Sequence, residues 1–165
     1  MSSAPRSSPP PTDRPGFELP LRLLAGFRSL IDDLHAELGQ LGHPDMRPLH
    51  GFVLQAIGRH GTTAAELGRR LGVSKQAAGK TIDRLEQLGY VARVPDSVDQ
   101  RQKIVVLTDH GIDALQQSAA IFEQLHARWA DVLGADRLRA LEADLEAVTG
   151  EARIPLDMPG WFGAS

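Results

Sequence analysis

The stretch TAAELGRRLGVSKQAAGKTIDRLEQLG, residues 63–89, decides how this chain folds. Thr63 followed three residues later by Glu66 forms a capping box, so a helix is expected to begin here. Gly72 suits the left-handed residue that follows a helix end, and Ser74 is a strong N-cap for the next helix. The stretch therefore predicts two short helices joined by a tight turn.

The second of these helices, expected to reach about Leu88, has two different faces. Ala78, Ile82 and Leu85 recur at helical spacing and form its buried side. Small or polar residues occupy the opposite front: Lys75, Gln76, Gly79, Lys80 and Asp83. Such a helix is held on its domain by the apolar back, while the narrow polar front is left to meet a partner.

The sequence period changes after Gly89. Residues 90–94 and 103–107 are predicted strands, and the polar loop 95–102 joins them into a hairpin with a long tip. Thr108 is expected to cap a long helix that ends near Leu133. After Gly134, a last helix is expected over about 136–149.

Helical periodicity also precedes the deciding stretch. One apolar stripe, beginning near Pro20, comprises Leu23, Leu24, Phe27, Leu30, Ile31, Leu34 and Leu38. A further helix is expected over about 48–59. The predicted fold class is mainly α with a small β-hairpin wing, that is, a winged helix-turn-helix flanked by N- and C-terminal helices.

Composition excludes several kinds of function. The chain has no cysteine, so disulfides and thiolate sites are excluded, and no apolar run is long enough for a membrane span. The N-terminus lacks the apolar stretch of a signal peptide, and a cytoplasmic location is the expectation. No enzyme motif occurs, and the six histidines lack the spacing of a zinc site. We therefore expect neither catalytic residues nor a metal or other cofactor.

The charge distribution points to nucleic acid. The net charge is −3, yet residues 58–107 carry +4 and the remainder carries −7. A basic segment within an acidic chain is typical of a local phosphate-facing surface.

The front of the second helix has the chemistry of a major-groove reader. Ser74 and the free N–H groups of the first turn can hold a phosphate. Gln76 can pair with adenine, and Lys75 or Lys80 can reach guanine or phosphate. Gly79 would let the backbone approach the groove closely.

The hairpin supplies further candidates. Arg101 at its tip can enter a narrow minor groove, and Asp99 would hold its side chain extended. Arg93 and Lys103, near the strand ends, would contact phosphates at most.

These motifs resemble those of the MarR family of transcriptional regulators. The run 63–78 is similar to the family's helix-turn-helix, and 82–91 to its recognition-helix end. Asp99-Gln100-Arg101-Gln102-Lys103, followed by Val106-Leu107-Thr108-Asp109-His110-Gly111, matches the family's wing pattern.

The resemblance implies that Ser74, Lys75, Gln76 and Lys80 meet the major groove and Arg101 the minor groove. Arg84 matches a family arginine that contacts phosphate or pairs with a wing aspartate, and both alternatives stay open. Gly79 departs from the hydroxyl or amide residue of many members.

The resemblance also implies a domain organisation. It implies a single domain, 17–150, followed by a tail, 151–165. Residues 1–16, which are rich in Ser and Pro, are expected from their composition to form a disordered arm. Within the domain, 48–107 would form the DNA-binding lobe, and 17–42 and 108–150 the dimerisation helices.

The function implied is that of a homodimeric repressor of transcription that binds a pseudo-palindromic operator in double-stranded DNA. A small aromatic or phenolic effector would release it, and the residues in the segments expected to line its crevice are His35, Arg47, His50 and Trp129. Two alternatives remain, namely an interaction module that has lost DNA binding and a metal-responsive regulator.

Overall fold

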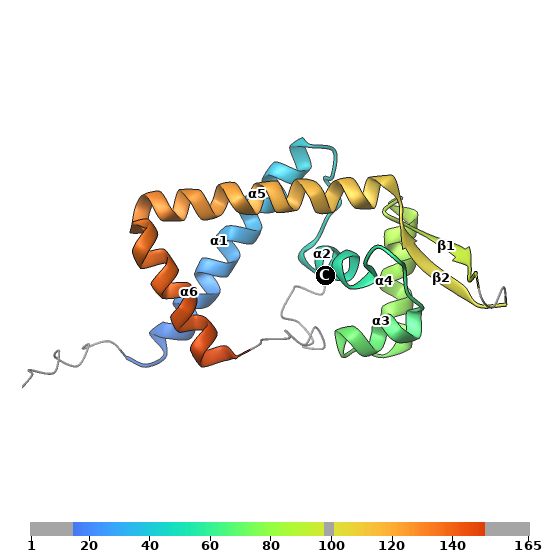
Figure 1. The fold of residues 1–165 in the computed structure, drawn as a ribbon, viewed down its shortest axis with the longest axis horizontal. Helices are drawn as coiled ribbons and strands as arrows, with labels where there is room; N and C mark the ends of the chain where they lie inside the picture. The colour runs from blue at the N-terminus through green and yellow to red at the C-terminus, as the bar shows by residue number, and fades with distance from the viewer. Residues whose placement is uncertain (1–14, 98–100, 151–165) are drawn as a thin grey trace, which may run out of the picture.

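The structure, a computed structural model, describes residues 15–97 and 101–150. Its elements follow in the order α1 (Glu18–Gln40), α2 (Pro48–Ile57), α3 (Ala64–Leu71), α4 (Lys75–Gln87), β1 (Val91–Pro95), β2 (Lys103–Leu107), α5 (Asp109–Leu133) and α6 (Ala135–Thr149). Helix α5 runs along the molecule, with α1 and α6 at one end and a lobe of α2, α3, α4 and the hairpin at the other (Figure 1). The predicted fold class is confirmed.

The turn between α3 and α4 forms as the local sequence dictates. The hydroxyl of Thr63 accepts the backbone N–H of Glu66 at 3.1 Å, which caps α3. Gly72 ends α3 with φ 69°, in the left-handed region that glycine adopts without strain. The N–H of Val73 then donates to the carbonyl of Gly68 at 2.9 Å, and Ser74 caps α4. The N-caps at Thr63 and Ser74 are confirmed, but the capping box is only half formed, because the Glu66 carboxylate pairs with Arg69 and Arg70.

The hairpin is antiparallel, and its register pairs Val91 with Leu107 and Pro95 with Lys103. Tyr90 was predicted to start the first strand, but the strand begins at Val91. The N–H of Tyr90 donates to Leu85 at 2.9 Å, so Tyr90 closes the end of α4 instead. Helix α2 likewise ends at Ile57 rather than near residue 59, because Gly58 ends it with φ 66°.

The start of α5 is packed against the end of α4. The hydroxyl of Thr108 accepts the N–H of Gly111 at 3.1 Å and donates to the carbonyl of Gly89 at 2.6 Å. A Cβ on Gly111 would lie 2.1 Å from the backbone oxygen of Tyr90. Glycine is therefore required here by a close approach of two backbones, which places the start of α5 against the segment between α4 and β1.

A single core joins the lobe to α5 and to the second half of α1. The apolar stripe of α1 is covered only in part: Leu34 and Leu38 are buried, whereas Leu23 and Leu24 are 46% and 43% exposed. Both exposed leucines precede the stretch of α1 that packs on the core. None of the described helices is both long and apolar enough to span a membrane.

Candidate nucleic-acid interface

Helix α4 presents a polar front on a buried back. Ala78, Ile82 and Leu85 are at most 2% exposed and anchor the helix in the lobe. Four candidate residues on the other side are exposed: Ser74, Lys75, Gln76 and Lys80. The hydroxyl of Ser74 accepts the N–H of Ala77 at 3.1 Å, so it is oriented by the helix that it caps.

Gly79 lies in the middle of this front and leaves open space around it. No atom comes within 4 Å of the position that a Cβ would occupy there, apart from neighbouring helix backbone. Packing within the lobe therefore does not require glycine at this position. The space remains available to a partner that approaches the helix backbone.

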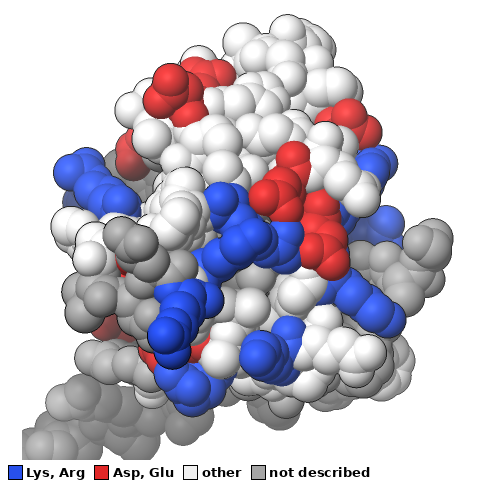
Figure 2. All heavy atoms as spheres, turned by 90° about the vertical axis from the view of Figure 1, so that its right-hand side faces the viewer, with Lys and Arg blue, Asp and Glu red and all other residues white. Residues whose placement is uncertain are grey.

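The hairpin places two further candidates beside α4. Arg101 and Lys103 are exposed, and Lys103 begins β2 opposite Pro95. Asp99, expected to orient Arg101, lies outside the described residues. Figure 2 views the end of the molecule that carries α3, α4 and the hairpin, and basic side chains gather over the middle and lower part of this face.

Arg84 is exposed on α4 and forms no ion pair within the described parts of the chain. Of the two wing aspartates with which it could pair, Asp99 falls outside those parts. The choice between a phosphate contact and an ion pair therefore stays a prediction.

Arg93, which was expected to contact phosphate at most, forms ion pairs with side chains of α4. Its guanidinium donates to Asp83 at 2.5 Å through Nη2 and to Glu86 through Nη1. Hydrogen bonding to Asp83 raises the pKa of Arg93, and Glu86 raises it further. The guanidinium of Arg93 and these two carboxylates thereby join the wing to α4.

Comparison with known proteins identifies the group to which this lobe belongs. A sequence model described as the MarR family matches residues 45–102. The transcriptional repressor MdtR of Bacillus subtilis (strain 168) is 27% identical over 117 residues, which cover 70% of this chain and 74% of MdtR. Another curated relative is matched over only 29% of its length. The reduced form of MarR from E. coli superposes with a TM-score of 0.64 and 28% identity, over 84% of this chain and 98% of that one.

These comparisons support a MarR-family transcriptional regulator. The fold is shared more widely: a mutant of S. aureus MepR, solved bound to an oligodeoxyribonucleotide, has a TM-score of 0.57 at 19% identity and covers 82% of this chain and 96% of that chain.

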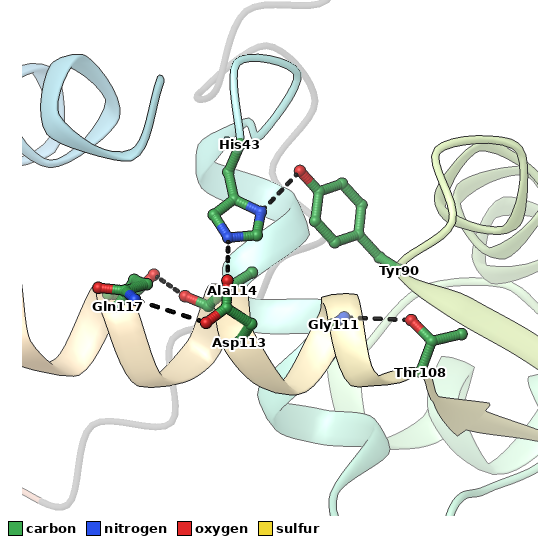
Figure 3. A network of polar contacts seen from close by, with 8 residues as sticks. His43, Tyr90, Thr108, Gly111, Asp113, Ala114 and Gln117 are labelled. Carbon is green, nitrogen blue, oxygen red and sulfur yellow. Dashed lines mark hydrogen bonds and ion pairs between the residues drawn. The ribbon is translucent and has the colours of Figure 1, made fainter. Parts of the chain in front are cut away.

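A partly buried polar junction lies where the lobe meets α5 (Figure 3). His43, 1% exposed, is in the segment between α1 and α2. Its Nε2 lies 2.9 Å from Asp113 of α5, and its Nδ1 lies 3.3 Å from the hydroxyl of Tyr90. The ring of His110 stacks on Tyr90 with centroids 4.5 Å apart. The junction is not predictable from the sequence, because no local pattern relates residues so far apart.

The protonation pattern of the junction follows from its chemistry. The hydrogen bond from His43 lowers the pKa of Asp113, so this carboxylate is ionised near neutral pH and can only accept. In the tautomer that carries its proton on Nε2, His43 donates to Asp113 and accepts at Nδ1 from Tyr90. Each of the three side chains then has a hydrogen-bond partner.

The four residues expected to line an effector crevice do not come together. His35 and Arg47 line one apolar crevice between α1, α2 and α5, together with Met46, Phe52 and Phe122. Trp129 lines a different crevice between α5 and α6. His50 lines neither, because its buried ring caps α2 by accepting the N–H of Arg47 at 3.2 Å.

The first crevice is small, with a cavity volume of about 50 Å³, and opens to solvent. Arg47 stands at its edge, where its Nη1 donates to the carbonyl of Met46 at 3.1 Å. An apolar crevice with one cation at its margin suits a small aromatic anion. No cluster of three His, Asp or Glu side chains that could hold a metal ion occurs among the described residues.

Proposed function

We propose that this MarR-family protein is a homodimeric repressor that binds a pseudo-palindromic operator in double-stranded DNA and is released by a small aromatic ligand. The observation that carries the proposal is the polar front of α4 on its buried back. The major groove, about 12 Å wide, accepts one such helix, and the N-terminal residues of the helix reach the base edges.

The candidate residues are suited to different parts of the DNA, according to their positions on the lobe. Ser74, Lys75, Gln76 and Lys80 stand on the front of α4 for the major groove, and Arg101 at the hairpin tip is suited to the minor groove. Lys103 and Arg84 are exposed, so they are free to contact the phosphates of the DNA. The net charge of +4 over residues 58–107 favours the approach of DNA to this face. That MepR was solved with an oligodeoxyribonucleotide supports DNA as the partner of this fold.

Dimerisation is supported by the apolar surface at the other end of the molecule. Phe17, Leu19 and Leu21 on or beside α1 are 65%, 65% and 58% exposed, and Val148 on α6 is 80% exposed. A stable monomer rarely leaves so many large apolar side chains in water. A second copy that covers them would set two α4 helices against successive turns of DNA, which are about 34 Å apart.

The effector would occupy the crevice of His35 and Arg47, since α1, α2 and α5 meet there and connect the lobe to the dimerisation helices. The two lobes of a dimer can lie at different distances from each other. A ligand that binds more tightly at one of these distances shifts the population of dimers toward it. Release from DNA follows when the favoured spacing no longer matches the operator.

The deciding experiment is a DNA-binding titration at several salt concentrations, with the gene's own upstream region against an unrelated duplex of equal length. Preference for the upstream region, with affinity that falls steeply as salt rises, is expected of a sequence-specific regulator. Absence of binding to either duplex at low salt would overturn the proposal and leave an interaction module as the better description. Sedimentation of the protein at several concentrations tests the dimer separately.

A further inference from the structure

We infer that Arg93 is a positioning residue for DNA recognition, which fixes the wing against α4 and screens two carboxylates that face the DNA. The inference rests on the proposed DNA binding. Arg93 itself is not the DNA contact. It acts through Asp83 and Glu86.

The geometry ties Arg93 to α4 at three points. Its guanidinium binds Asp83 with one terminal nitrogen and Glu86 with the other. Its backbone N–H also donates to Glu86 at 3.3 Å. A planar guanidinium presents its donors in a fixed fork, so the two carboxylates determine the orientation of the side chain. The Arg93 side chain is only 28% exposed, which leaves it little freedom to leave α4 for a phosphate.

The position of Asp83 explains why a cation is needed there. Residues at spacings of three and four share a face of a helix, so Asp83 follows Gln76 and Lys80 along the front of α4. Its side chain is 60% exposed. An ionised carboxylate on this face would repel phosphates, and it would offset the attraction that Lys80 provides.

Arg93 compensates for this charge from the neighbouring strand. Within residues 15–97 and 101–150, the ion pairs of Asp83 and Glu86 are formed with Arg93 alone. The cluster of the three residues therefore carries one net negative charge, whereas the two carboxylates without Arg93 would carry two.

The same contacts set the angle between α4 and the wing. Arg93 lies in β1 opposite Val105 of β2, two residues from Lys103, where the hairpin leaves the lobe toward Arg101. Holding the base of the hairpin on α4 fixes where its tip lies relative to the recognition helix. A protein that reads the major groove with α4 and the minor groove with the tip needs this spacing to be constant.

A double-mutant cycle separates this role from a direct phosphate contact. The variants are Arg93→Met, the pair Asp83→Asn with Glu86→Gln, and all three changes together, each titrated with the upstream duplex. Arg139→Met, which breaks an exposed ion pair with Asp136 on α6, is the control of equal charge change. The midpoint of thermal unfolding is recorded for each variant, so that binding is compared only among folded proteins.

We expect Arg93→Met to weaken binding about tenfold, in the range of losing one charged contact, and Arg139→Met to bind like the parent. Neutralising Asp83 and Glu86 should then strengthen binding about tenfold in the Arg93→Met background but less than about threefold when Arg93 is present. Equal gains in the two backgrounds would mean that Arg93 acts independently of the carboxylates and would overturn the inference.

Three further outcomes are informative. If Arg93→Met does not fold, Arg93→Gln retains a polar side chain at this position and completes the same cycle. If the parent binds no duplex, the proposed function fails and the inference with it. If the parent binds its operator and the cycle is additive, only the role of Arg93 is wrong.

Discussion

The Nε2 of His43 lies 2.9 Å from a carboxylate oxygen of Asp113, although the two residues are 70 positions apart in the chain. His43 stands between α1 and α2, and Asp113 stands in the first turns of α5. Together with Tyr90, just after the end of α4, they join three segments at one partly buried point (Figure 3). The lobe is therefore connected to the long helix by directional polar contacts as well as by apolar packing.

We expect His43→Leu to lower the free energy of unfolding by about 1–3 kcal/mol, because it leaves the buried hydroxyl of Tyr90 without its partner. Urea unfolding measures the effect. Adding Tyr90→Phe to His43→Leu removes the orphaned hydroxyl and should recover part of the loss. A strictly additive pair of changes would show that the contact between the two side chains is not what stabilises the junction.

His50 should make the protein less stable as the pH falls below about 6.5. Burial lowers the pKa of His50, and the positive charge of Arg47 lowers it further. The unfolded chain therefore takes up a proton at His50 before the folded chain does. This part of the stability is complete above pH 6.5 and is lost as the pH falls toward the lower folded pKa.

Unfolding in urea at pH 7.5 and 5.5, compared between the parent and His50→Gln, tests this expectation; the pH values are about one unit on either side of the ordinary histidine pKa. Glutamine can still accept the N–H of Arg47 but does not titrate, so the variant should lose less stability on acidification. The exposed His60 provides the control His60→Gln. A pH dependence in His50→Gln that equals that of the parent would contradict the assignment.

Two glycines in helices should respond to alanine in opposite directions. Gly111→Ala should destabilise the protein by at least about 2 kcal/mol, because the new Cβ would overlap the backbone oxygen of Tyr90. Gly79→Ala meets no atom and should stabilise α4 by up to about 1 kcal/mol. If the DNA backbone approaches Gly79 closely, the same stabilised variant binds its operator more weakly, and unchanged affinity would exclude that approach.

Lys80→Ala should lower the slope of log affinity against log salt by about one unit if Lys80 contacts phosphate. If Lys80 instead contacts a base, the slope should stay nearly constant while the preference among operator variants changes. The measurement is a salt series with the operator and single-base substitutions of it. A variant that binds like the parent in both respects would remove Lys80 from the interface.

Arg101→Ala should weaken binding most on operators with a narrow minor groove, where the negative potential is enhanced. Flanks of the operator that are rich in A·T, compared with G·C-rich flanks, supply the two groove widths. Equal loss on both would indicate that Arg101 contacts only the DNA backbone.

Arg47 and Trp129 should differ in their effect on an aromatic effector, because they line different crevices. With benzoate as the probe, Arg47→Met should raise the concentration needed to release DNA about tenfold, the cost of one lost charged contact. Trp129→Phe should leave that concentration unchanged. The reverse pattern would move the effector site to the crevice between α5 and α6.

Local rules were sufficient for much of the lobe. Thr63, Ser74 and Thr108 each cap the helix that follows them, because the hydrogen bond involved spans only three residues. The two strands of the hairpin and the polar front of α4 were likewise predictable from the spacing of apolar and polar residues. The strand start at Tyr90 was placed one residue early, since nothing local reveals that its N–H donates back to Leu85.

The candidate sites show the same division. Gln76 and Lys80 share a helix face by spacing alone, whereas the set of His35, Arg47, His50 and Trp129 combined residues that the fold separates. The ion pairs of Arg93 were not predicted either, because its partners Asp83 and Glu86 lie across the turn at Gly89. From the sequence alone, it is not apparent which of several oppositely charged residues will form an ion pair.

By itself, the amino-acid sequence determined the helices, their caps, the hairpin and the polar front of α4, because hydrogen bonds over three or four residues and periodic burial are local. Only the tertiary structure decided that His43 meets Asp113, that Arg93 holds Asp83 and Glu86, and that Leu34 is covered while Leu23 is not. Those contacts join separate segments, and their partners are set by how the segments pack around α5.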